Sequence, residues 1–328
     1  MIMMKRLKAL SAVLAAAMLL AGCSDDTLLL SYSSKNNNTH KITSFVTDSN
    51  IYQSSFLSSG VCVIPENKIS LPSGVNLSSQ GILLVNADTN EMVMSKKIYD
   101  KLYPASLTKL ATALVCLKYG NLDDIVTVSY AASHITEPGA KLCFLQEGDK
   151  IDLRTLLTAF IVYSGNDAGI AIAEHISGSE PAFAELMNSE LAGLGAVDTH
   201  FVNSHGLPND DHYTTAYDMY LVMNELIKYD EFNSIAAIDS FTAQFNDASG
   251  KPVKKVFENT NKYLIGERSL PSGVSIIASK TGTTLAAGSC LVMAVNGIDN
   301  SRYIAVIMKA SDANILYSEM NKLLEHTK

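Results

Sequence analysis

Three short groups of residues in this sequence carry side chains suited to nucleophilic catalysis. The first is Ser106-Leu107-Thr108-Lys109, which places a hydroxyl and an amine at positions i and i+3. On a helix, residues with this spacing project from the same face, so the two groups can meet. A serine becomes an effective nucleophile when a base takes its proton. A lysine can be that base where apolar surroundings and neighbouring positive charge favour its neutral form. The spacing therefore predicts Ser106 as a nucleophile and Lys109 as its base.

The position of this pair in the chain supports the same chemistry. Pro104-Ala105 opens a segment with a helical apolar pattern that ends at Gly120, so Ser106 is expected in the first helical turn. Unpaired N–H groups and the helix dipole at that end favour developing negative charge. No other serine of the chain is followed by a lysine three residues later. By itself, the pattern also fits an amphipathic helix with a surface lysine.

The second group, Ser164-Gly165-Asn166, falls in a break between two apolar segments with helical periodicity. A loop at such a break can present a hydroxyl and an amide to a cleft. The same residue types are also common where one helix ends and the next begins, so this group too has an ordinary structural explanation.

The third group is Lys280-Thr281-Gly282-Thr283, at the end of an apolar strand pattern. On a strand, Lys280 and Gly282 share one face, and the two threonines point to the other. Gly282 would allow a substrate to approach the backbone closely, as an added strand does. A strand that simply ends in a Thr/Gly turn would have the same sequence.

Taken together and in this order, the three groups resemble the motif set of penicillin-binding proteins and serine β-lactamases. The sequence around them is similar to the D-alanyl-D-alanine carboxypeptidases, the low-molecular-mass penicillin-binding proteins of peptidase family S11. The segments that carry this resemblance are 103–109, 163–168 with Ala173-Glu174, 199–203, 205–207, 212–219 and 280–284. The similarity runs from about Gly81 to Leu324, which is nearly all of the chain that we expect to fold.

The resemblance implies a catalytic role for three residues. Ser106 would form an acyl ester with the substrate, and Lys109 would accept the proton of Ser106. Ser164 would relay a proton to the departing D-alanine. The backbone N–H groups of Ser106 and Thr283 would form the oxyanion hole.

The resemblance also implies how substrate is held. Asn166 would hold the substrate amide, and Thr283 would help to hold the terminal carboxylate. Lys280 and Thr281 would organise the electrostatics of the site, with Gly282 beside them on the same strand. The implied substrate is a peptidoglycan pentapeptide ending in D-Ala-D-Ala, the implied inhibitors are β-lactams, and no cofactor is implied.

Two other functions share parts of this pattern. A class A β-lactamase needs a deacylating glutamate in an E-x-x-L-N setting, a spacing that Glu185-Leu186-Met187-Asn188 lacks, and it usually has Asp at the position of Gly165. A non-catalytic wall-binding or β-lactam-sensing lipoprotein could keep the fold, although three complete motifs argue against it. The sequence also departs from many S11 relatives, which continue into a second β-rich domain and an amphipathic helix. Only 46 residues (328 − 282) follow Gly282 here.

The elements that must position these motifs can be predicted from periodicity. Strand patterns cover Gly81–Val85, Glu91–Lys96, Val274–Thr281, Ser289–Val295 and Tyr303–Met308. Helical patterns cover Asp152–Tyr163, Ala168–Ile176, Ala182–Leu194, Thr215–Tyr229 and Asp312–Glu325. We expect an α/β (α+β) fold in which the early hairpin and the three late strands form one central antiparallel sheet. Helices would flank that sheet, a helical lobe would adjoin it, and the site would lie in the crevice between them. With the resemblance, this is a β-lactamase/transpeptidase-like fold.

Composition excludes several classes of protein. Hydrophobic residues make up 47% of the 328 residues, which is enough to build a core, and the formal net charge of −8 makes nucleic acid an unlikely target. No sequence pattern indicates a zinc site or another metal site. Apart from Cys23, we expect Cys62, Cys116, Cys143 and Cys290 to be free thiols, because two of them lie in apolar helix or strand patterns.

The N-terminus has the features of an export signal. Three basic residues precede an apolar run from Ala9 to Ala21, which ends in Leu20-Ala21-Gly22-Cys23 and resembles the bacterial lipobox. An ordinary signal peptide with a cysteine near its end is the alternative. The predicted organisation is a lipoprotein signal peptide over 1–22, a lipidated Cys23 with a flexible stalk over 23–75, and a catalytic domain over 76–328. The protein would then be exported and anchored to the outer face of the bacterial cytoplasmic membrane.

Overall fold

The central sheet joins the two ends of the folded chain. The computed structural model describes residues 60–328. Its five-stranded antiparallel sheet has the order β2-β1-β9-β8-β7. The strands are β1 (Gly81–Asn86), β2 (Glu91–Lys96), β7 (Ser275–Thr284), β8 (Gly288–Asn296) and β9 (Arg302–Ala310). The predicted pairing of the early hairpin with the three late strands is therefore confirmed.

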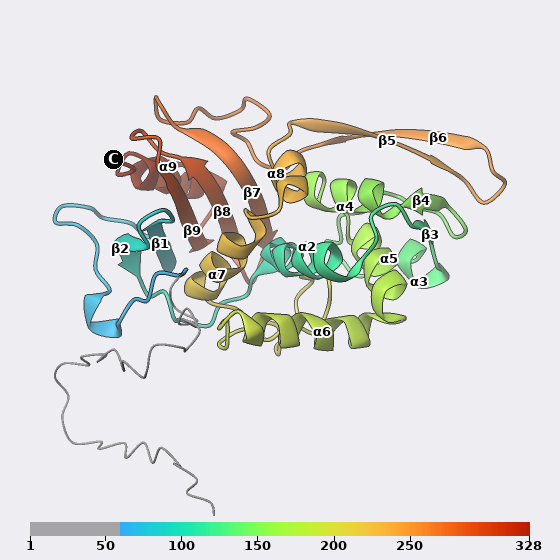
Figure 1. Cartoon of the computed structure of the whole chain (residues 1–328), viewed down its shortest axis with the longest axis horizontal. Helices are drawn as coiled ribbons and strands as arrows, with labels where there is room; N and C mark the ends of the chain where they lie inside the picture. The colour runs from blue at the N-terminus through green and yellow to red at the C-terminus, as the bar shows by residue number, and fades with distance from the viewer. Residues whose placement is uncertain (1–59) are drawn as a thin grey trace, which may run out of the picture. The chain divides into compact units, whose positions relative to one another are not determined.

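Helices cover both faces of this sheet (Figure 1). Along β1, Ile82 and Leu84 belong to the cluster that packs on α9, whereas Leu83 and Val85 belong to the cluster that contains α2, α7 and α8. Because both faces are buried, β1 is a continuous apolar run instead of an alternating one. The helices are α2 (Thr108–Tyr119), α3 (Tyr130–Ser133), α4 (Leu153–Val162), α5 (Asn166–Ser177), α6 (Glu180–Gly193), α7 (Ala216–Leu226), α8 (Asp230–Ala236) and α9 (Ala313–Leu324), with short 3-10 turns η1 (Glu66–Lys68) and η2 (Ala105–Leu107).

Helix α2 lies at the centre of the fold and carries Lys109 in its first turn. Its residues from Thr108 to Cys116 are all buried, and the helix packs among α4, α5, α6 and α7. A helix that is enclosed on every side gives its buried polar side chains no access to bulk water. Lys109 must therefore find its hydrogen-bond partners inside the protein.

A second sheet was not predicted from the sequence. It has the order β3-β4-β5-β6 and consists of β3 (Ile125–Thr127), β4 (Lys150–Asp152), β5 (Ser240–Asn246) and β6 (Pro252–Glu258). Two of its strands are three residues long, and β5 and β6 alternate between exposed and more buried positions. Short strands and a hairpin with one solvated face leave no apolar run in the sequence, which explains why the pattern was missed.

The first described residues correct the predicted domain boundary. Cys62 and Ile64 are only 3% exposed. The Cys62 N–H donates to the Tyr220 hydroxyl (2.8 Å), and the Cys62 carbonyl accepts from the Tyr217 hydroxyl (2.9 Å). The predicted stalk over 23–75 is thus too long at its C-terminal end, because this segment packs against α7. The predicted signal peptide, Cys23 and the rest of the stalk lie outside the described residues.

The cysteines and the start of helix α5 can also be compared with the sequence predictions. Cys62, Cys116, Cys143 and Cys290 are free and buried, as predicted. Helix α5 begins at Asn166, two residues earlier than expected, because Gly165 is its N-cap. Within residues 60–328, no helix has the length and apolar character needed to cross a membrane.

The packing of residues 61–64 can be tested by mutation. Replacing Ile64 by Ala should lower the free energy of unfolding by about 2 kcal/mol or more, because it removes a buried side chain from the core. Replacing the neighbouring Val63, which is 64% exposed, should change it by less than about 0.5 kcal/mol. Urea unfolding of the two variants measures the difference. Equal stability of both would mean that this segment is part of the stalk after all.

Candidate active site

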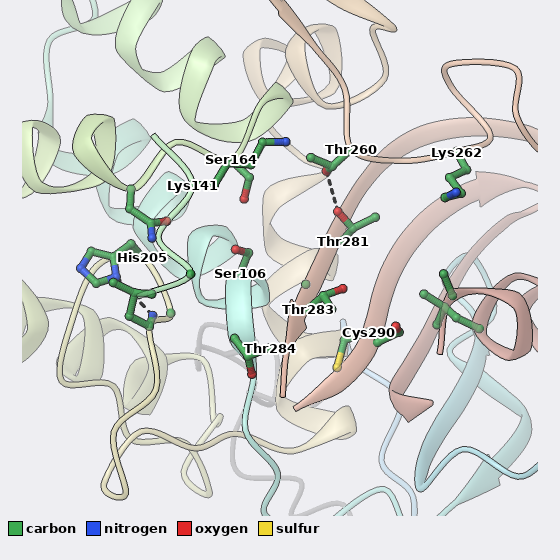
Figure 2. A pocket seen from close by; sticks show the side chains of 18 of the residues that line it. Ser106, Lys141, Ser164, His205, Thr260, Lys262, Thr281, Thr283, Thr284 and Cys290 are labelled. Atoms are coloured by element: carbon green, nitrogen blue, oxygen red, sulfur yellow. Dashed lines mark hydrogen bonds between the residues drawn. The ribbon is translucent and has the colours of Figure 1, made fainter. Parts of the chain in front are cut away.

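The three predicted motifs meet at one pocket with a volume of about 310 Å³ (Figure 2). Its wall includes the predicted residues Ser106, Ser164, Asn166, Thr281, Gly282 and Thr283. Lys109 and Lys280 lie behind the wall and are 0% and 1% exposed. The wall also contains residues that the motifs did not include: Gly139, Lys141, His205, Gly206, Leu207, Thr260, Lys262, Thr284, Ser289, Cys290, Ala313, Leu316 and Tyr317.

Ser106 lies in the 3-10 turn η2, directly before α2, and not in the first α-helical turn as expected. The preceding Ala105 has a positive φ of 49°, an uncommon and strained conformation for a residue with a side chain. The Thr108 hydroxyl donates to the Ala105 carbonyl (2.9 Å) and receives the Nε2–H of His212 (2.7 Å). This buried chain of hydrogen bonds holds the turn that presents Ser106.

The protonation state of His212 follows from its surroundings. Its Nδ1 accepts the N–H of Val202 (3.1 Å), so the hydrogen of the neutral ring is on Nε2, which faces Thr108. Burial, with a smaller contribution from the His200 charge, lowers the pKa of His212 to about 3. His212 is therefore a fixed neutral donor beneath the nucleophile turn.

Two glycines allow neighbouring segments to pack against this turn. A Cβ on Gly282 would lie 2.9 Å from the Pro104 carbonyl oxygen and 3.0 Å from the Ser106 nitrogen. A Cβ on Gly206 would lie 1.9 Å from the Ala105 carbonyl oxygen. The sequence explained Gly282 by a close approach of substrate, whereas in the structure it is the backbone around Ser106 that requires a glycine there.

Lys109 makes three contacts through its Nζ atom. It lies 3.1 Å from the Ser106 Oγ, 2.8 Å from the Asn166 Oδ1 and 2.5 Å from the His205 carbonyl oxygen. Burial, followed by the charge of Lys280, holds the pKa of Lys109 well below its ordinary value. A neutral amine has two hydrogens and one lone pair. Because two of its three neighbours are carbonyl oxygens that can only accept, the lone pair is left for the hydrogen of Ser106.

The His205 carbonyl is placed by a loop that the sequence indicated only through the family resemblance. The Asn203 Oδ1 accepts the N–H groups of His205 (3.3 Å) and Gly206 (2.7 Å). The Thr112 hydroxyl on α2 donates to the Ser204 carbonyl (2.6 Å). A backbone carbonyl as a partner for Lys109 has no side-chain signature, so no motif could have shown it.

Among the motif residues, Ser164 is the one with a buried side-chain polar atom that lacks a hydrogen-bond partner. It has a positive φ of 72° and is 4% exposed, and its buried Oγ has no hydrogen-bond partner. Figure 2 shows the Ser106 and Ser164 hydroxyls directed toward one another. A buried hydroxyl without a partner is unfavourable in a folded protein, and such groups concentrate where a ligand completes the hydrogen bonds.

Gly165 is required by the loop beneath the second motif. A Cβ at this position would lie 2.2 Å from the Sγ of Cys143. The buried Asp167 carboxylate ties the same loop to α5, since it accepts the N–H groups of Cys143 (2.8 Å) and Leu145 (3.1 Å). An aspartate at position 165, as in class A β-lactamases, therefore has no room in this protein.

The third motif has the predicted alternation. Lys280 and Gly282 are buried, whereas Thr281 is half-buried and Thr283 is exposed. The Lys280 Nζ donates to the Thr281 carbonyl (3.2 Å), and the hydroxyls of Thr281 and Thr260 lie 2.5 Å apart. Burial and then the charge of Lys141 lower the pKa of Lys280 to about 7.

The electrostatics of the pocket favour an anion. Lys141 and Lys262 line its wall, and none of its described lining residues is acidic. Among residues 60–328, no group of three or more His, Cys, Asp and Glu side chains could hold a metal ion. The groups that this pocket offers to a ligand are a serine, amines and further hydroxyls.

Comparison with known proteins places this geometry in a family. A profile described as D-alanyl-D-alanine carboxypeptidase, peptidase S11, matches residues 67–312. The D-alanyl-D-alanine carboxypeptidase DacF of Bacillus subtilis (strain 168) is 32% identical over 255 residues, which cover 75% of this chain and 61% of that protein. The carboxypeptidase DacD of Escherichia coli (strain K12) is 32% identical over 278 residues, covering 82% and 67%.

Solved structures confirm the predicted β-lactamase/transpeptidase-like fold. The crystal structure of the Streptomyces K15 DD-transpeptidase superposes with a TM-score of 0.71 at 26% identity, covering 78% of this chain and 99% of that one. Measured against the first of the curated relatives, DacF, the chain spans about three fifths of the length.

The position of Lys109 predicts the pH dependence of acylation. Because its pKa lies well below the ordinary lysine value of 10.5, the neutral base forms at a lower pH than in an exposed lysine. The rate of acylation by a fluorescent penicillin should rise with pH through that lowered pKa. Lys109→Arg should abolish the rise and nearly all acylation, because a guanidinium does not lose its proton in a protein. A rate independent of pH, or near-native labelling of Lys109→Arg, would make another group the base.

Proposed function

This chain belongs to the D-alanyl-D-alanine carboxypeptidase family, peptidase S11, and we propose that it is a serine-type carboxypeptidase that removes the terminal D-alanine from peptidoglycan stem peptides. The observation that supports this most directly is the arrangement around Lys109. Two carbonyl oxygens accept hydrogen bonds from the neutral amine of Lys109, so that its lone pair faces the Ser106 hydroxyl. Such an arrangement serves a serine nucleophile.

The acylation step follows from this arrangement. Ser106 Oγ gives its proton to the Lys109 Nζ and forms a bond to the carbonyl carbon of the penultimate D-alanine. The N–H groups of Ser106 and Thr283 stabilise the resulting oxyanion. When the C–N bond breaks, the departing amine takes the proton that Lys109 held, and the free hydroxyl of Ser164 is the relay. The products are an acyl ester on Ser106 and free D-alanine.

Deacylation repeats the same proton transfers with water. Lys109, again neutral, takes a proton from a water molecule that attacks the ester carbonyl, and the proton returns to Ser106 Oγ as the C–O bond breaks. The shortened peptide leaves with a new carboxylate. β-Lactams would inhibit by acylating the same serine: Ser106 Oγ bonds to the lactam carbonyl carbon, the ring C–N bond breaks, and the protonated amine stays attached to the ester.

The alternative functions differ in the fate of the acyl ester. A β-lactamase hydrolyses the penicilloyl ester quickly, which requires a carboxylate to activate water, and no described residue lining this pocket carries one. A transpeptidase passes the acyl group to an amine instead of water, and the Streptomyces K15 protein is named for that reaction. A wall-binding module would form no ester at all.

Labelling and hydrolysis distinguish these functions. Incubation with a fluorescent penicillin should give a long-lived adduct, and incubation with a pentapeptide ending in D-Ala-D-Ala should release D-alanine. Ser106→Ala should lose both, by about 10⁴-fold or more in turnover, because the nucleophile and base act as a unit. Ser234→Ala, which changes an exposed serine on α8, is the matched control and should change neither.

Three results would contradict the proposal. Rapid turnover of the penicillin indicates a β-lactamase, and the absence of both label and released D-alanine indicates a binding module. Comparable cleavage of a pentapeptide with an amidated C-terminus would show that the free carboxylate is not required and would indicate endopeptidase action.

We also propose that the protein is exported and held on the outer face of the cytoplasmic membrane by a lipid on Cys23. The supporting features are the basic residues before the apolar run and the small residues Ala21-Gly22 that precede Cys23. The peptidoglycan substrate lies on that side of the membrane. Two or more acyl chains would anchor the protein stably, whereas a single chain would not.

Membrane fractionation after a salt wash tests the anchor. Wild-type protein and the control Ser24→Ala should stay with the membranes, and Cys23→Ala should move to the soluble fraction or the medium. Full retention of Cys23→Ala on the membranes would place the anchor elsewhere.

A further inference from the structure

The pocket wall contains one lysine whose charge has no carboxylate partner and that belongs to none of the three motifs. This residue is Lys141. Of the two lysines that line the pocket, Lys262 pairs with the Glu267 carboxylate at 2.8 Å. Within the described part of the chain, no acidic group lies within ion-pair distance of Lys141. Lys141 thus contributes an uncompensated positive charge to the pocket.

The position of Lys141 is set by the second motif. Its carbonyl oxygen accepts the N–H of Asn166 (2.7 Å), and its Nζ lies 4.0 Å from the centre of the Tyr163 ring. Tyr163 in turn packs against Phe257 of β6, with ring centres 5.1 Å apart. Burial lowers the pKa of Lys141. The ring attracts the protonated amine without neutralising it, so the charge stays available to a ligand. Figure 2 shows Lys141 beside Ser164, with its amine directed away from the Ser164 hydroxyl in this view.

The charge of Lys141 also acts on the buried lysines of the site. After burial, it is the main reason for the lowered pKa of Lys280, and it contributes to the lowered pKa of Lys109. The charges of Lys141 and Lys280 thus oppose one another at a pocket whose described lining contains no acidic residue. An anion that enters this space relieves that repulsion, which makes its binding more favourable than at a single lysine.

The chemistry of the leaving group indicates which anion this is. Ser164 must reach the nitrogen of the departing D-alanine in order to return its proton. In an amino acid, only the α-carbon separates that nitrogen from the terminal carboxylate. A cation beside Ser164 is therefore on the same side of the scissile bond as the carboxylate, and the oxyanion hole at Ser106 lies on the other side of the reacting carbon.

We propose that Lys141 is a specificity-determining residue that binds the terminal carboxylate of the substrate. This inference rests on the proposed function, since it takes the leaving group to be an amino acid with a free carboxylate. The site then distinguishes free C-termini by a direct ion pair from Lys141, in addition to the threonine hydroxyls of β7. Lys262 has no such role, because Glu267 already compensates its charge.

Acylation by a penicillin and by its methyl ester tests the proposal without requiring peptide hydrolysis. In benzylpenicillin, the carboxylate is attached to the carbon next to the lactam nitrogen, as in the natural leaving group. Wild-type protein should react faster with the acid than with the ester. Lys141→Gln should lower the second-order rate constant for the acid by about tenfold to one-hundredfold, the value of a hydrogen bond to a charged group. Because the charge of Lys141 also lowers the pKa of Lys109, the rates are compared at a pH where Lys109 is neutral in both proteins, and there the same variant should slow the ester much less than the acid.

Two further variants complete the test. Lys141→Arg should retain most of the preference for the acid, because it keeps the charge. Lys262→Gln, from the same pocket wall, should lower the preference for the acid much less than Lys141→Gln does, because Lys262 already pairs with Glu267. In addition, the KM of a D-Ala-D-Ala peptide should rise in Lys141→Gln, whereas cleavage of an amidated peptide, where detectable, should not change.

The possible results separate failure of this proposal from failure of the proposed function. If Lys141→Gln slows acid and ester equally, Lys141 has a structural role only, and the proposal is wrong. It is also wrong if that variant retains the full preference for the acid, or if Lys262→Gln loses it. In these cases the wild type remains a penicillin-reactive carboxypeptidase. A wild type that reacts with neither penicillin and releases no D-alanine would overturn the proposed function, and this inference with it.

Discussion

The site depends on Lys109, which is completely buried and whose amine has a partner for both of its hydrogens and for its lone pair. Burial alone would be unfavourable, since an ammonium without water or a counterion is costly in a protein interior. This cost is smaller when Lys109 is neutral and two carbonyl oxygens accept hydrogen bonds from its amine. The same two contacts orient its lone pair toward Ser106. Burial favours the neutral form of Lys109, and its hydrogen bonds orient the lone pair, so both effects come from one arrangement.

Much of the surrounding structure serves to keep that arrangement in place. Hydrogen bonds from Thr108 and the neutral His212 hold Ala105 in a strained conformation. This conformation begins the short turn that presents Ser106 to the pocket. Gly206 and Gly282 bring the His205 loop and strand β7 against the same turn. The strain is local, and the buried part of helix α2 that follows it, Thr108 to Cys116, supplies the rigidity that maintains it. The nucleophile turn, the loop and the strand thus form one packed unit.

The sequence predicts those parts of this unit that are encoded by side-chain type and local periodicity. Ser106, Lys109 and the central sheet follow from spacing and from apolar strands buried on both faces. The carbonyl partner from His205 could not be predicted, because every residue has a carbonyl group and only the path of the loop decides which one is used. The second sheet and the packing of residues 61–64 depend on contacts between distant segments, and their sequences are short, polar or close to the expected stalk. Lys141 was missed because a single lysine in a loop carries no pattern.

The unpredicted second sheet supports the site from below the second motif. Its hairpin places Phe257 against Tyr163, and Tyr163 lies under Lys141 and directly precedes Ser164. Cys143 and Asp167 fasten the loop that carries Lys141 to the start of α5, with Gly165 between them. Lys141, which binds the carboxylate, and Ser164, which protonates the leaving nitrogen, are therefore held by the same packed segments. Since the two groups act on neighbouring atoms of one amino acid, a common support keeps their spacing constant when the rest of the pocket adjusts to substrate.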